Sequence, residues 1–306
     1  MKKKLLLFLT PLVLLLSGCE AGAEEKEILY SFTDSLGREV EVSSYDRTVV
    51  LSGSLAEIWQ LAGGELYGVT DDAYDGRNLE LSDDVNNYGG VQNPSVESII
   101  ADGADFVILS GTIANQSKLK DTFDSAGITA AYFDVENFEE YLSVLKICTN
   151  ITGRDDLYIE NGENIRTEVE AAIQSAQGHA SPDILLLRAI STGMRAKDSS
   201  SMTGQMLADL GCVNIADSET SLLEELSLEA IVRADPDFIF ITTIGDSEAG
   251  LAQYEAELVS NPAWQELTAV KIGNVYILPK DLYHYKPNVR WAEAYENLAE
   301  ILYENE

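Results

Sequence analysis

The stretch PSVESIIADGADFVIL, residues 94–109, returns 132 residues later as LSLEAIVRADPDFIFI, residues 226–241. Aligned without gaps, the two copies share a serine, a glutamate, an isoleucine, an aspartate and a phenylalanine, and most other apolar positions stay apolar. A weaker repeat relates SLAEIWQLAGG (54–64) to SMTGQMLADLGC (201–212). Self-similarity of this kind marks repeated supersecondary units. The sequence therefore predicts a similar helix-then-strand unit in each half of the chain.

The N-terminus has the features of a processing signal. Three lysines precede an apolar run that is too short for a membrane span of about 20 residues, and the run ends in Leu-Ser-Gly-Cys at 16–19. This ending matches a bacterial lipobox, which predicts that residues 1–18 are a lipoprotein signal peptide and that Cys19 is lipidated. An ordinary secretory signal with an incidental cysteine is the alternative. Residues 19–29 are predicted to be a flexible tether, so we expect an extracytoplasmic protein held at the cell membrane by its lipid alone.

The charge of the chain limits its partners. The sequence has 20 Lys+Arg against 52 Asp+Glu, a net charge of −32, and removal of residues 1–18 leaves 17 basic against 52 acidic side chains. Such a charge repels nucleic acid and anionic lipid surfaces, so neither is an expected partner, and it suits solubility outside the cell. Beyond Cys19 only Cys148 and Cys212 remain, which is too few for a disulfide framework.

Short apolar strands alternate with helices in residues 30–137 and again in residues 179–306, which is typical of parallel sheets wrapped by helices. Residues 138–178 instead show two amphipathic helical stripes, with Gly153 as the break. We therefore predict an α/β fold of two Rossmann-like lobes with parallel-rich sheets, joined by one long helical spine, with the ligand cleft between the lobes. The expected elements are a hairpin at 30–42, strands at 48–52, 66–70, 105–110, 130–134, 183–189, 237–243 and 274–279, and helices at 54–62, 95–101, 115–126, 203–210, 227–233 and 248–259.

Loops at the carboxyl ends of parallel strands converge on such a cleft. Basic side chains stand out there against an acidic chain, and tyrosines add flat faces for an aromatic or macrocyclic ligand. The candidate ligand-binding residues are Ser52, Ser54, Tyr74, Gln92, Thr112, Arg195, Lys197, Tyr283, His284, Tyr285 and Arg290. The four that we favour are Arg195, Tyr283, Tyr285 and Arg290. For each residue taken singly, a place in an ordinary surface loop is the alternative.

The lipobox, the two lobes joined by one helical stretch and the paired S-x-E-x-I…D-F unit together resemble the class III solute-binding proteins of ABC importers, over residues 30–306. The resemblance implies a binding protein, not an enzyme, that captures an iron chelate such as a ferric siderophore or haem and delivers it to a permease dimer. A corrinoid such as cobalamin is the alternative ligand. The chain departs from the family in one turn, where Ala104 precedes Asp105 in place of the proline kept at Pro236.

The resemblance also implies a role for the glutamate of each repeat. Glu97 and Glu229 would dock into arginine pockets on the two halves of the permease, and the binding protein would act as a monomer. The residues themselves allow a second interpretation, because a carboxylate in the first turn of a helix suits the positive end of the helix dipole. Both interpretations stand at this point.

A metal site and catalysis are the rival interpretations. Only His179 and His284 exist, far apart in sequence, so a metal site built on imidazoles is not expected, nor is a cofactor. His284 could be an axial ligand to haem iron or a hydrogen-bonding group in the cleft. No G-x-S-x-G, H-E-x-x-H, Walker or G-x-G-x-x-G pattern occurs, so a secreted hydrolase that uses a carboxylate pair is the remote alternative.

Overall fold

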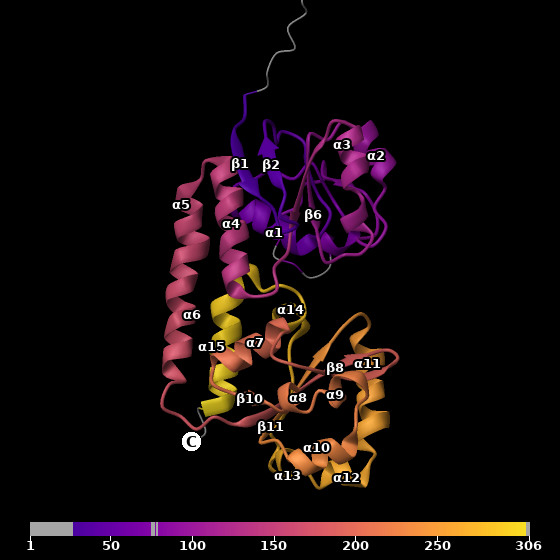
Figure 1. Ribbon diagram of the computed structural model, residues 1–306, viewed down its shortest axis with the longest axis vertical. Helices are drawn as coiled ribbons and strands as arrows, with labels where there is room; N and C mark the ends of the chain where they lie inside the picture. The colour runs from indigo at the N-terminus through magenta and orange to yellow at the C-terminus, as the bar shows by residue number, and fades with distance from the viewer. Residues whose placement is uncertain (1–26, 75–76, 78, 304–306) are drawn as a thin grey trace, which may run out of the picture.

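The structure is a computed structural model that describes residues 27–74, 77 and 79–303. Figure 1 shows two lobes stacked along the long axis of the molecule, with a column of helices running past both on one side. Each lobe is built around a parallel-rich sheet, so the predicted α/β class is confirmed. The predicted signal peptide and Cys19 lie outside the described residues.

The N-terminal lobe contains a five-stranded parallel sheet in the order β5-β4-β3-β6-β7. Its strands are β3 (Thr48–Val50), β4 (Gly68–Val69), β5 (Asn86–Asn87), β6 (Phe106–Ser110) and β7 (Thr129–Phe133). The elements that connect them are α1 (Gly53–Leu61), η1 (Asp71–Tyr74), α2 (Val96–Ala101), η2 (Gln116–Lys118) and α3 (Lys120–Ser125). From β3 the chain adds β4 and β5 on one side, and it then adds β6 and β7 on the other. The strand order thus reverses between β3 and β6, so the carboxyl ends of these two strands border a crevice.

The helix expected at 115–126 is divided into η2 and α3. Gln116 is buried, and its side-chain amide donates to the carbonyls of Leu51 at 2.5 Å and Val91 at 2.9 Å. Its side-chain oxygen accepts from the N–H of Ser110. These bonds tie the first turn to the ends of the central strands, so α3 begins only at Lys120.

The predicted hairpin is present as β1 (Tyr30–Thr33) and β2 (Glu39–Val42), paired antiparallel. Its turn is held by the buried carboxylate of Asp34, which accepts from the backbone N–H of Arg38 and of Tyr132 on β7. The Arg38 guanidinium donates to the carbonyl of Ala130 on the same strand. The hairpin thus covers the outer edge of β7, which would otherwise offer unpaired backbone groups.

The C-terminal lobe contains a sheet in the order β10-β8-β11-β12, all parallel. These strands are β8 (Asp183–Ile190), β10 (Val213–Asn214), β11 (Phe238–Thr243) and β12 (Val275–Ile277), and β9 (Gly193–Lys197) adds to β8 antiparallel. The helices are α7 (Met202–Asp209), α8 (Ile215–Ser218), α9 (Ser221–Glu224), α10 (Leu228–Ala234), α11 (Ser247–Tyr254) with η4 (Glu255–Val259), α12 (Pro262–Gln265), α13 (Thr268–Ile272), α14 (Lys280–Tyr283) and, after η5 (Asn288–Arg290), α15 (Trp291–Tyr303).

Arg195 and Lys197, which we expected in a cleft loop, lie instead on a strand, because β9 forms a hairpin with β8. Met194 and Ala196 are buried, whereas Arg195 and Lys197 lie on the opposite face of β9. Gly193, at φ 138, adopts the backbone conformation that closes the turn. The alternation covers too few residues to be read as a strand from the sequence.

The spine consists of helical segments from Phe138 to Ser175. Helix α4 (Phe138–Thr152) is capped by the side chain of Asn137 and ends at Gly153, whose φ of 71° is left-handed. The chain then turns back through α5 (Asp155–Tyr158), η3 (Ile159–Glu163) and α6 (Asn164–Ser175), which follow one another without a break. The column that links the lobes in Figure 1 is therefore α5–η3–α6, with α4 beside the upper lobe and α15 packed on α6 in the lower one.

One hydrophobic cluster extends through both lobes and the spine. It contains Trp59 of α1, Tyr141 of α4 and Trp291 of α15, each fully buried. The Trp291 ring lies 5.7 Å from the ring of Phe138 and 6.4 Å from that of Tyr141, centroid to centroid. Rings at this spacing contribute packing energy beyond the area that they bury. The start of α15 is thus fixed to the spine.

No helix in the described part of the chain is both long and apolar enough to cross a membrane.

A buried hydrogen-bonded pair also joins the lobes. The side-chain amide of Asn288 donates to the Ser54 carbonyl at 3.1 Å and to the Glu57 carboxylate at 2.9 Å, across 234 and 231 residues of sequence. Asn288 is fully buried and has a left-handed φ of 52°. Burial raises the pKa of Glu57, and the Asn288 bond together with the charges of Arg77 and Arg290 opposes that rise only in part.

We expect the Glu57→Gln variant to change how stability depends on pH. A raised folded-state pKa means that the stability gained from the protonated carboxyl is fully present below the unfolded-state pKa and is lost as pH rises through the folded-state pKa. The variant lacks this loss, so its unfolding free energy relative to wild type should increase from acidic to neutral pH. Urea unfolding at a series of pH values measures this, with exposed Glu168→Gln on α6 as control. Parallel pH curves for Glu57→Gln and wild type would contradict the assignment.

Candidate functional site

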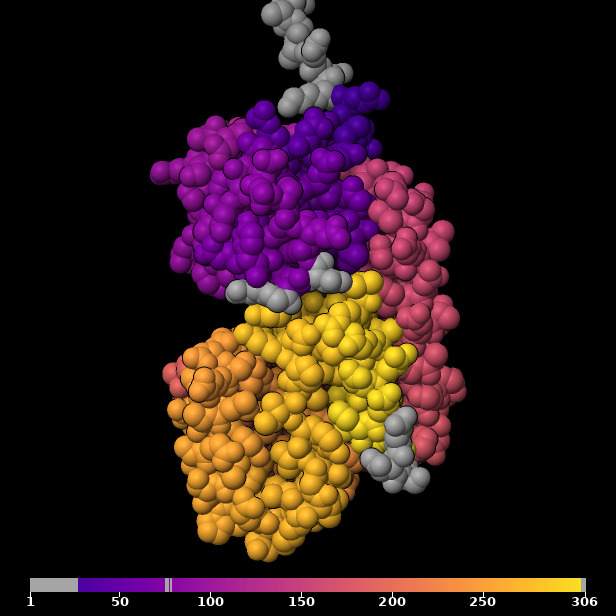
Figure 2. Space-filling view, turned by 180° about the vertical axis from the view of Figure 1, so that it is seen from behind, coloured from indigo at the N-terminus to yellow at the C-terminus, as the bar shows by residue number. Residues whose placement is uncertain are grey.

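The carboxyl ends of both central sheets face the space between the lobes. Figure 2 shows a notch there, on the side away from the helical spine. The strand order reverses between β3 and β6 in the N-terminal lobe and between β8 and β11 in the C-terminal lobe. Ligands of open α/β sheets bind at such reversal points. The cleft is therefore the candidate binding site.

The candidates of the N-terminal lobe are polar and mostly accessible. Thr112 is exposed, and its backbone N–H donates to Asp134 at 3.0 Å. Gln92 is exposed and Tyr74 is 51 % exposed, while Ser52 is half-buried at the start of α1. Ser54 differs, since it is buried and its hydroxyl accepts from the guanidinium of Arg77 at 2.7 Å.

Two arginines lie directly opposite each other on the β8–β9 hairpin. The antiparallel register pairs Arg188 with Arg195, and Lys197 lies two residues further on the same face. Like charges placed opposite each other on neighbouring strands destabilise a sheet. Within the described residues neither guanidinium has a carboxylate at salt-bridge distance, and the buried Nε of Arg188 has no hydrogen-bond partner. Burial lowers the pKa of Arg188. The arrangement is the kind that an anionic group would complete.

His284 lies in the same positively charged surroundings. Burial, together with the positive charges of Arg188, Lys280, Lys286 and Arg77, lowers its pKa to about 4. The imidazole is consequently neutral at physiological pH, and four cations from both lobes surround it. Lys286 also bridges to Glu136, just before the spine, at 3.1 Å.

The Tyr285 ring contacts cations rather than an open space. The Arg77 guanidinium lies 4.5 Å from the ring centroid, and the Lys280 ammonium lies 5.0 Å from it. Cation–π contacts of this geometry are attractive. Lys280 in turn donates to the Gly245 carbonyl at 2.8 Å. Tyr285 therefore helps to hold the lobes together through Arg77, which comes from the N-terminal lobe.

Two favoured residues lie elsewhere than expected. Tyr283 is 1 % exposed, and its hydroxyl donates to the Ala294 carbonyl, so it is a core residue that a cleft ligand cannot reach. Arg290 is engaged with Asp281 at 2.6 Å and, through two nitrogens, with Glu293 at 2.6 and 2.8 Å. These carboxylates raise its pKa further and engage all three of its nitrogens. Both predictions rest on the expectation that a polar side chain in such a loop faces the cleft.

The junction around Arg290 is also too tight for a ligand. The space bordered by Glu57, Arg77, Tyr285 and Arg290 is about 20 Å³, whereas sites for small molecules are roughly 300–1,000 Å³. A small-molecule ligand in the cleft would have to lie further out than this junction.

The sequence interpretation missed Arg77, Arg188 and Lys280. A signal existed for Arg188, since it is the arginine that ends the buried run DILLL in an acidic chain. Arg77 lies in a polar segment without periodicity, and its contact with Tyr285 spans the two lobes, so no local pattern points to it.

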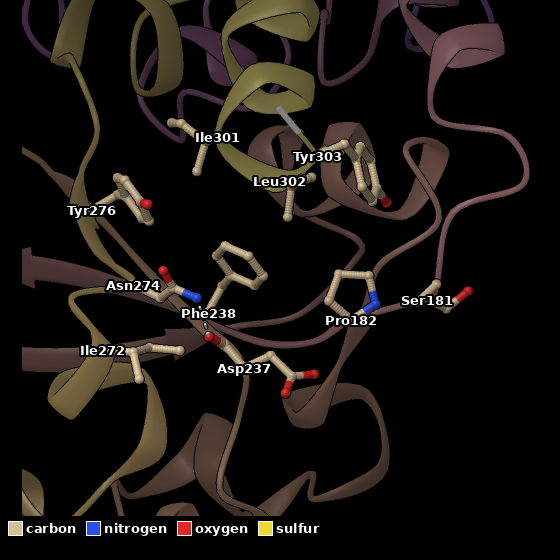
Figure 3. Close-up of a pocket in the computed structure, with 11 residues that line it drawn as sticks. Ser181, Pro182, Asp237, Phe238, Ile272, Asn274, Tyr276, Ile301, Leu302 and Tyr303 are labelled. Atoms are coloured by element: carbon tan, nitrogen blue, oxygen red, sulfur yellow. Dashed lines mark hydrogen bonds between the residues drawn. The ribbon is translucent and has the colours of Figure 1, made fainter. Parts of the chain in front are cut away.

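A larger hollow, about 470 Å³, lies on the other side of the C-terminal lobe (Figure 3). It is bordered by Pro182, Phe238, Asn274 and Tyr276, where β8, β11 and β12 begin, and by the end of α15. Because it is at the amino ends of the strands, it is not the site that the fold predicts for a ligand. Within the described residues no group of three or more His, Cys, Asp or Glu side chains is placed to hold a metal ion.

The two repeat glutamates are exposed. Glu97 is in the first turn of α2 on the N-terminal lobe, and Glu229 is in the first turn of α10 on the C-terminal lobe. Ser227 caps α10 through the N–H of Ala230 at 3.3 Å, whereas the Ser95 hydroxyl bonds to Ser98 instead. Neither glutamate is held by a salt bridge within the described chain.

Comparison with known proteins gives consistent matches. The family model described as periplasmic binding protein matches residues 48–282. Two Bacillus subtilis proteins are similar over most of their length: YhfQ, named as an ABC transporter substrate-binding lipoprotein, is 24 % identical over 95 % of this chain and 95 % of its own. The Fe(3+)-citrate-binding protein YfmC is 23 % identical over 88 % of this chain and 86 % of its own.

A solved structure shares the fold. The triscatecholate siderophore binding protein FeuA of Bacillus subtilis, complexed with ferri-bacillibactin, superposes with a TM-score of 0.70 at 18 % sequence identity. The superposition covers 90 % of this chain and 98 % of FeuA.

We expect His284 to titrate near pH 4, below the ordinary value of 6.5 for histidine. Removing one neighbouring cation with Arg188→Gln should raise this pKa, because less positive charge then opposes protonation. NMR titration of the imidazole ring protons measures both values, and a His179→Gln variant assigns the two signals. Arg166→Gln in the spine is the control and should leave His284 unchanged. A wild-type midpoint near 6.5 would show that the ring is neither buried nor surrounded by cations.

Proposed function

Because this chain belongs to the periplasmic binding protein family, we propose that it is the substrate-binding lipoprotein of an ABC importer for an anionic iron chelate. It captures a ferric siderophore or haem in the cleft and presents it to the permease. The family consists of binding proteins, so catalysis by a carboxylate pair has no part in the proposal.

The cross-strand arginines carry the proposal of an anionic ligand. In a chain of net charge −32, Arg188 and Arg195 lie side by side with no carboxylate at salt-bridge distance in the described residues, and the charge of Glu136 only opposes the effect of burial on Arg188. Guanidinium groups hold paired oxygens of carboxylates and catecholates in fixed geometry. The names of two similar proteins, one for ferric citrate and one for a ferric triscatecholate, support the same class of ligand. A corrinoid held mainly by stacking remains the second candidate, since Tyr74 keeps an exposed ring.

We expect Arg188→Ala and Arg195→Ala each to weaken binding of the anionic chelate roughly tenfold or more. A hydrogen bond to a charged group contributes about 1.5–3 kcal/mol, and about 1.4 kcal/mol corresponds to tenfold in affinity. Calorimetric titration with ferric citrate, a ferric triscatecholate, haemin and cobalamin measures the effect and identifies the ligand class. Arg166→Ala in the spine should bind normally. Tight cobalamin binding that both cleft variants retain would replace the chelate by a corrinoid.

The lipid anchor forms part of the proposal. The Leu-Ser-Gly-Cys ending and the name of the similar YhfQ support lipidation of Cys19 and a place outside the cytoplasm. Cys19→Ala should release the protein from the membrane or leave it unprocessed, and fractionation with a radioactive fatty-acid label checks this. A variant that stays in the membrane and keeps the label would refute the assignment.

The last part of the proposed function is docking of the protein to the permease through Glu97 and Glu229. Glu97 and Glu229 are exposed on separate lobes, as a partner with two similar halves requires. Rim charges of this kind steer and align a partner more than they add affinity.

Glu97→Ala and Glu229→Ala should therefore leave chelate affinity intact and lower ligand-dependent ATPase stimulation of the reconstituted importer. The double variant should be worse than either single one, because the two lobes contact separate permease halves. Added salt should weaken the wild-type contact in the same way. Glu168→Ala on α6 controls for the loss of a surface charge. Normal stimulation by the double variant would reduce both glutamates to partners of the helix dipole.

A further inference from the structure

The repeat places a second shared feature beside each glutamate. Three residues after Glu97 comes Ile100, and three residues after Glu229 comes Val232. Ile100 is 36 % exposed and Val232 is 39 % exposed, although both belong to short helices that pack on a sheet. Residues three apart lie on the same side of a helix, roughly 5–6 Å apart between Cβ atoms. Each lobe therefore presents a carboxylate with an aliphatic side chain next to it.

The fold does not require these two aliphatic residues. The preceding positions, Ile99 and Ile231, are fully buried and supply the contact with the sheet. On an amphipathic helix the next position faces solvent and is normally polar. A single exposed aliphatic residue needs no explanation. The same exposure at the same position in two copies, each time beside an exposed glutamate, is a repeated surface pattern.

We infer that each glutamate–aliphatic pair is a two-point docking site, and that Ile100 and Val232 insert into apolar spots on the two permease halves. The inference rests on the proposed docking of Glu97 and Glu229 and adds the apolar half of that contact. The partner that fits is a protein surface with a basic side chain and, one helical turn away, an apolar depression, presented twice. In such contacts the rim charge sets orientation, and the desolvated apolar group slows dissociation.

The two halves of the contact respond differently to salt. Salt screens the exposed glutamates, but it does not weaken burial of an aliphatic side chain. The glutamate variants should thus resemble wild type at high salt, where the charge is already screened. The aliphatic variants should be defective at low and high salt alike.

The test is uptake by cells in which Ile100→Ser with Val232→Ser replaces the wild-type lipoprotein. Ferric citrate and a ferric triscatecholate labelled with radioactive iron are the probes. We expect the chelate concentration for half-maximal uptake to rise roughly fivefold at both salt concentrations. Affinity of the purified variant for the same chelate should be unchanged. The swap Ile100→Val with Val232→Ile keeps both aliphatic groups and should transport normally. Ile159→Ser, at a 57 % exposed position of η3, is the matched control.

The outcomes separate this inference from the docking proposal. Normal uptake by the serine variant, together with impaired uptake by Glu97→Ala with Glu229→Ala, would overturn the aliphatic contact alone. Normal uptake by both would overturn the docking proposal and this inference with it. If the serine variant binds the chelate poorly, the uptake assay is repeated with Ile100→Thr and Val232→Thr, which change the side-chain shape less. The same two outcomes then apply.

Discussion

The structure depends on one hydrophobic cluster that both lobes and the spine share. Trp59, Tyr141 and Trp291 come from the first lobe, the spine and the last helix, and all three are fully buried in the same cluster. Alongside it, Asn288 donates from the C-terminal lobe to Glu57 in the N-terminal lobe. The two lobes are joined on the side of the spine and face each other across the cleft on the opposite side. A cleft between such lobes keeps its residues in register because its base is a packed core.

The cleft carries a group of positive charges although the chain as a whole is strongly negative. The chain is acidic, yet Arg77, Arg188, Lys280 and Lys286 all act on the half-buried ring of His284. Internal pairs such as Lys286–Glu136 satisfy some of these cations. Arg188 and Arg195, on neighbouring strands, have no carboxylate at salt-bridge distance in the described residues. Like charges that face each other across two strands destabilise the sheet unless a negative group binds beside them, so this pair is better explained by a ligand than by the fold.

The sequence predicted the layers of the fold well, because each depends on local periodicity. The two-sided burial of β6 and β11 makes continuous apolar runs, and Gly153 marks the end of α4. Short elements without such runs, β5, β9 and β10 among them, depend on partners elsewhere in the chain and were missed. The site was harder to predict. A loop sequence does not say which way a tyrosine points, so Tyr283 was misplaced, and Arg290 was chosen without knowledge of Asp281 and Glu293.

The β8–β9 hairpin breaks the symmetry of the repeat. The described part of the N-terminal lobe sheet has five parallel strands and no antiparallel strand on it. In the C-terminal lobe β9 pairs only with β8, beyond the point where β10 ends its pairing, and it packs against α9 and α11. Exchange of the outward-facing side chains of β9, Arg195 and Lys197, would alter the basic surface of the cleft, whereas Met194 and Ala196 keep the strand packed in the core of the lobe. The charge of this face can accordingly change through two side chains, while the duplicated frame that supports them keeps its own contacts.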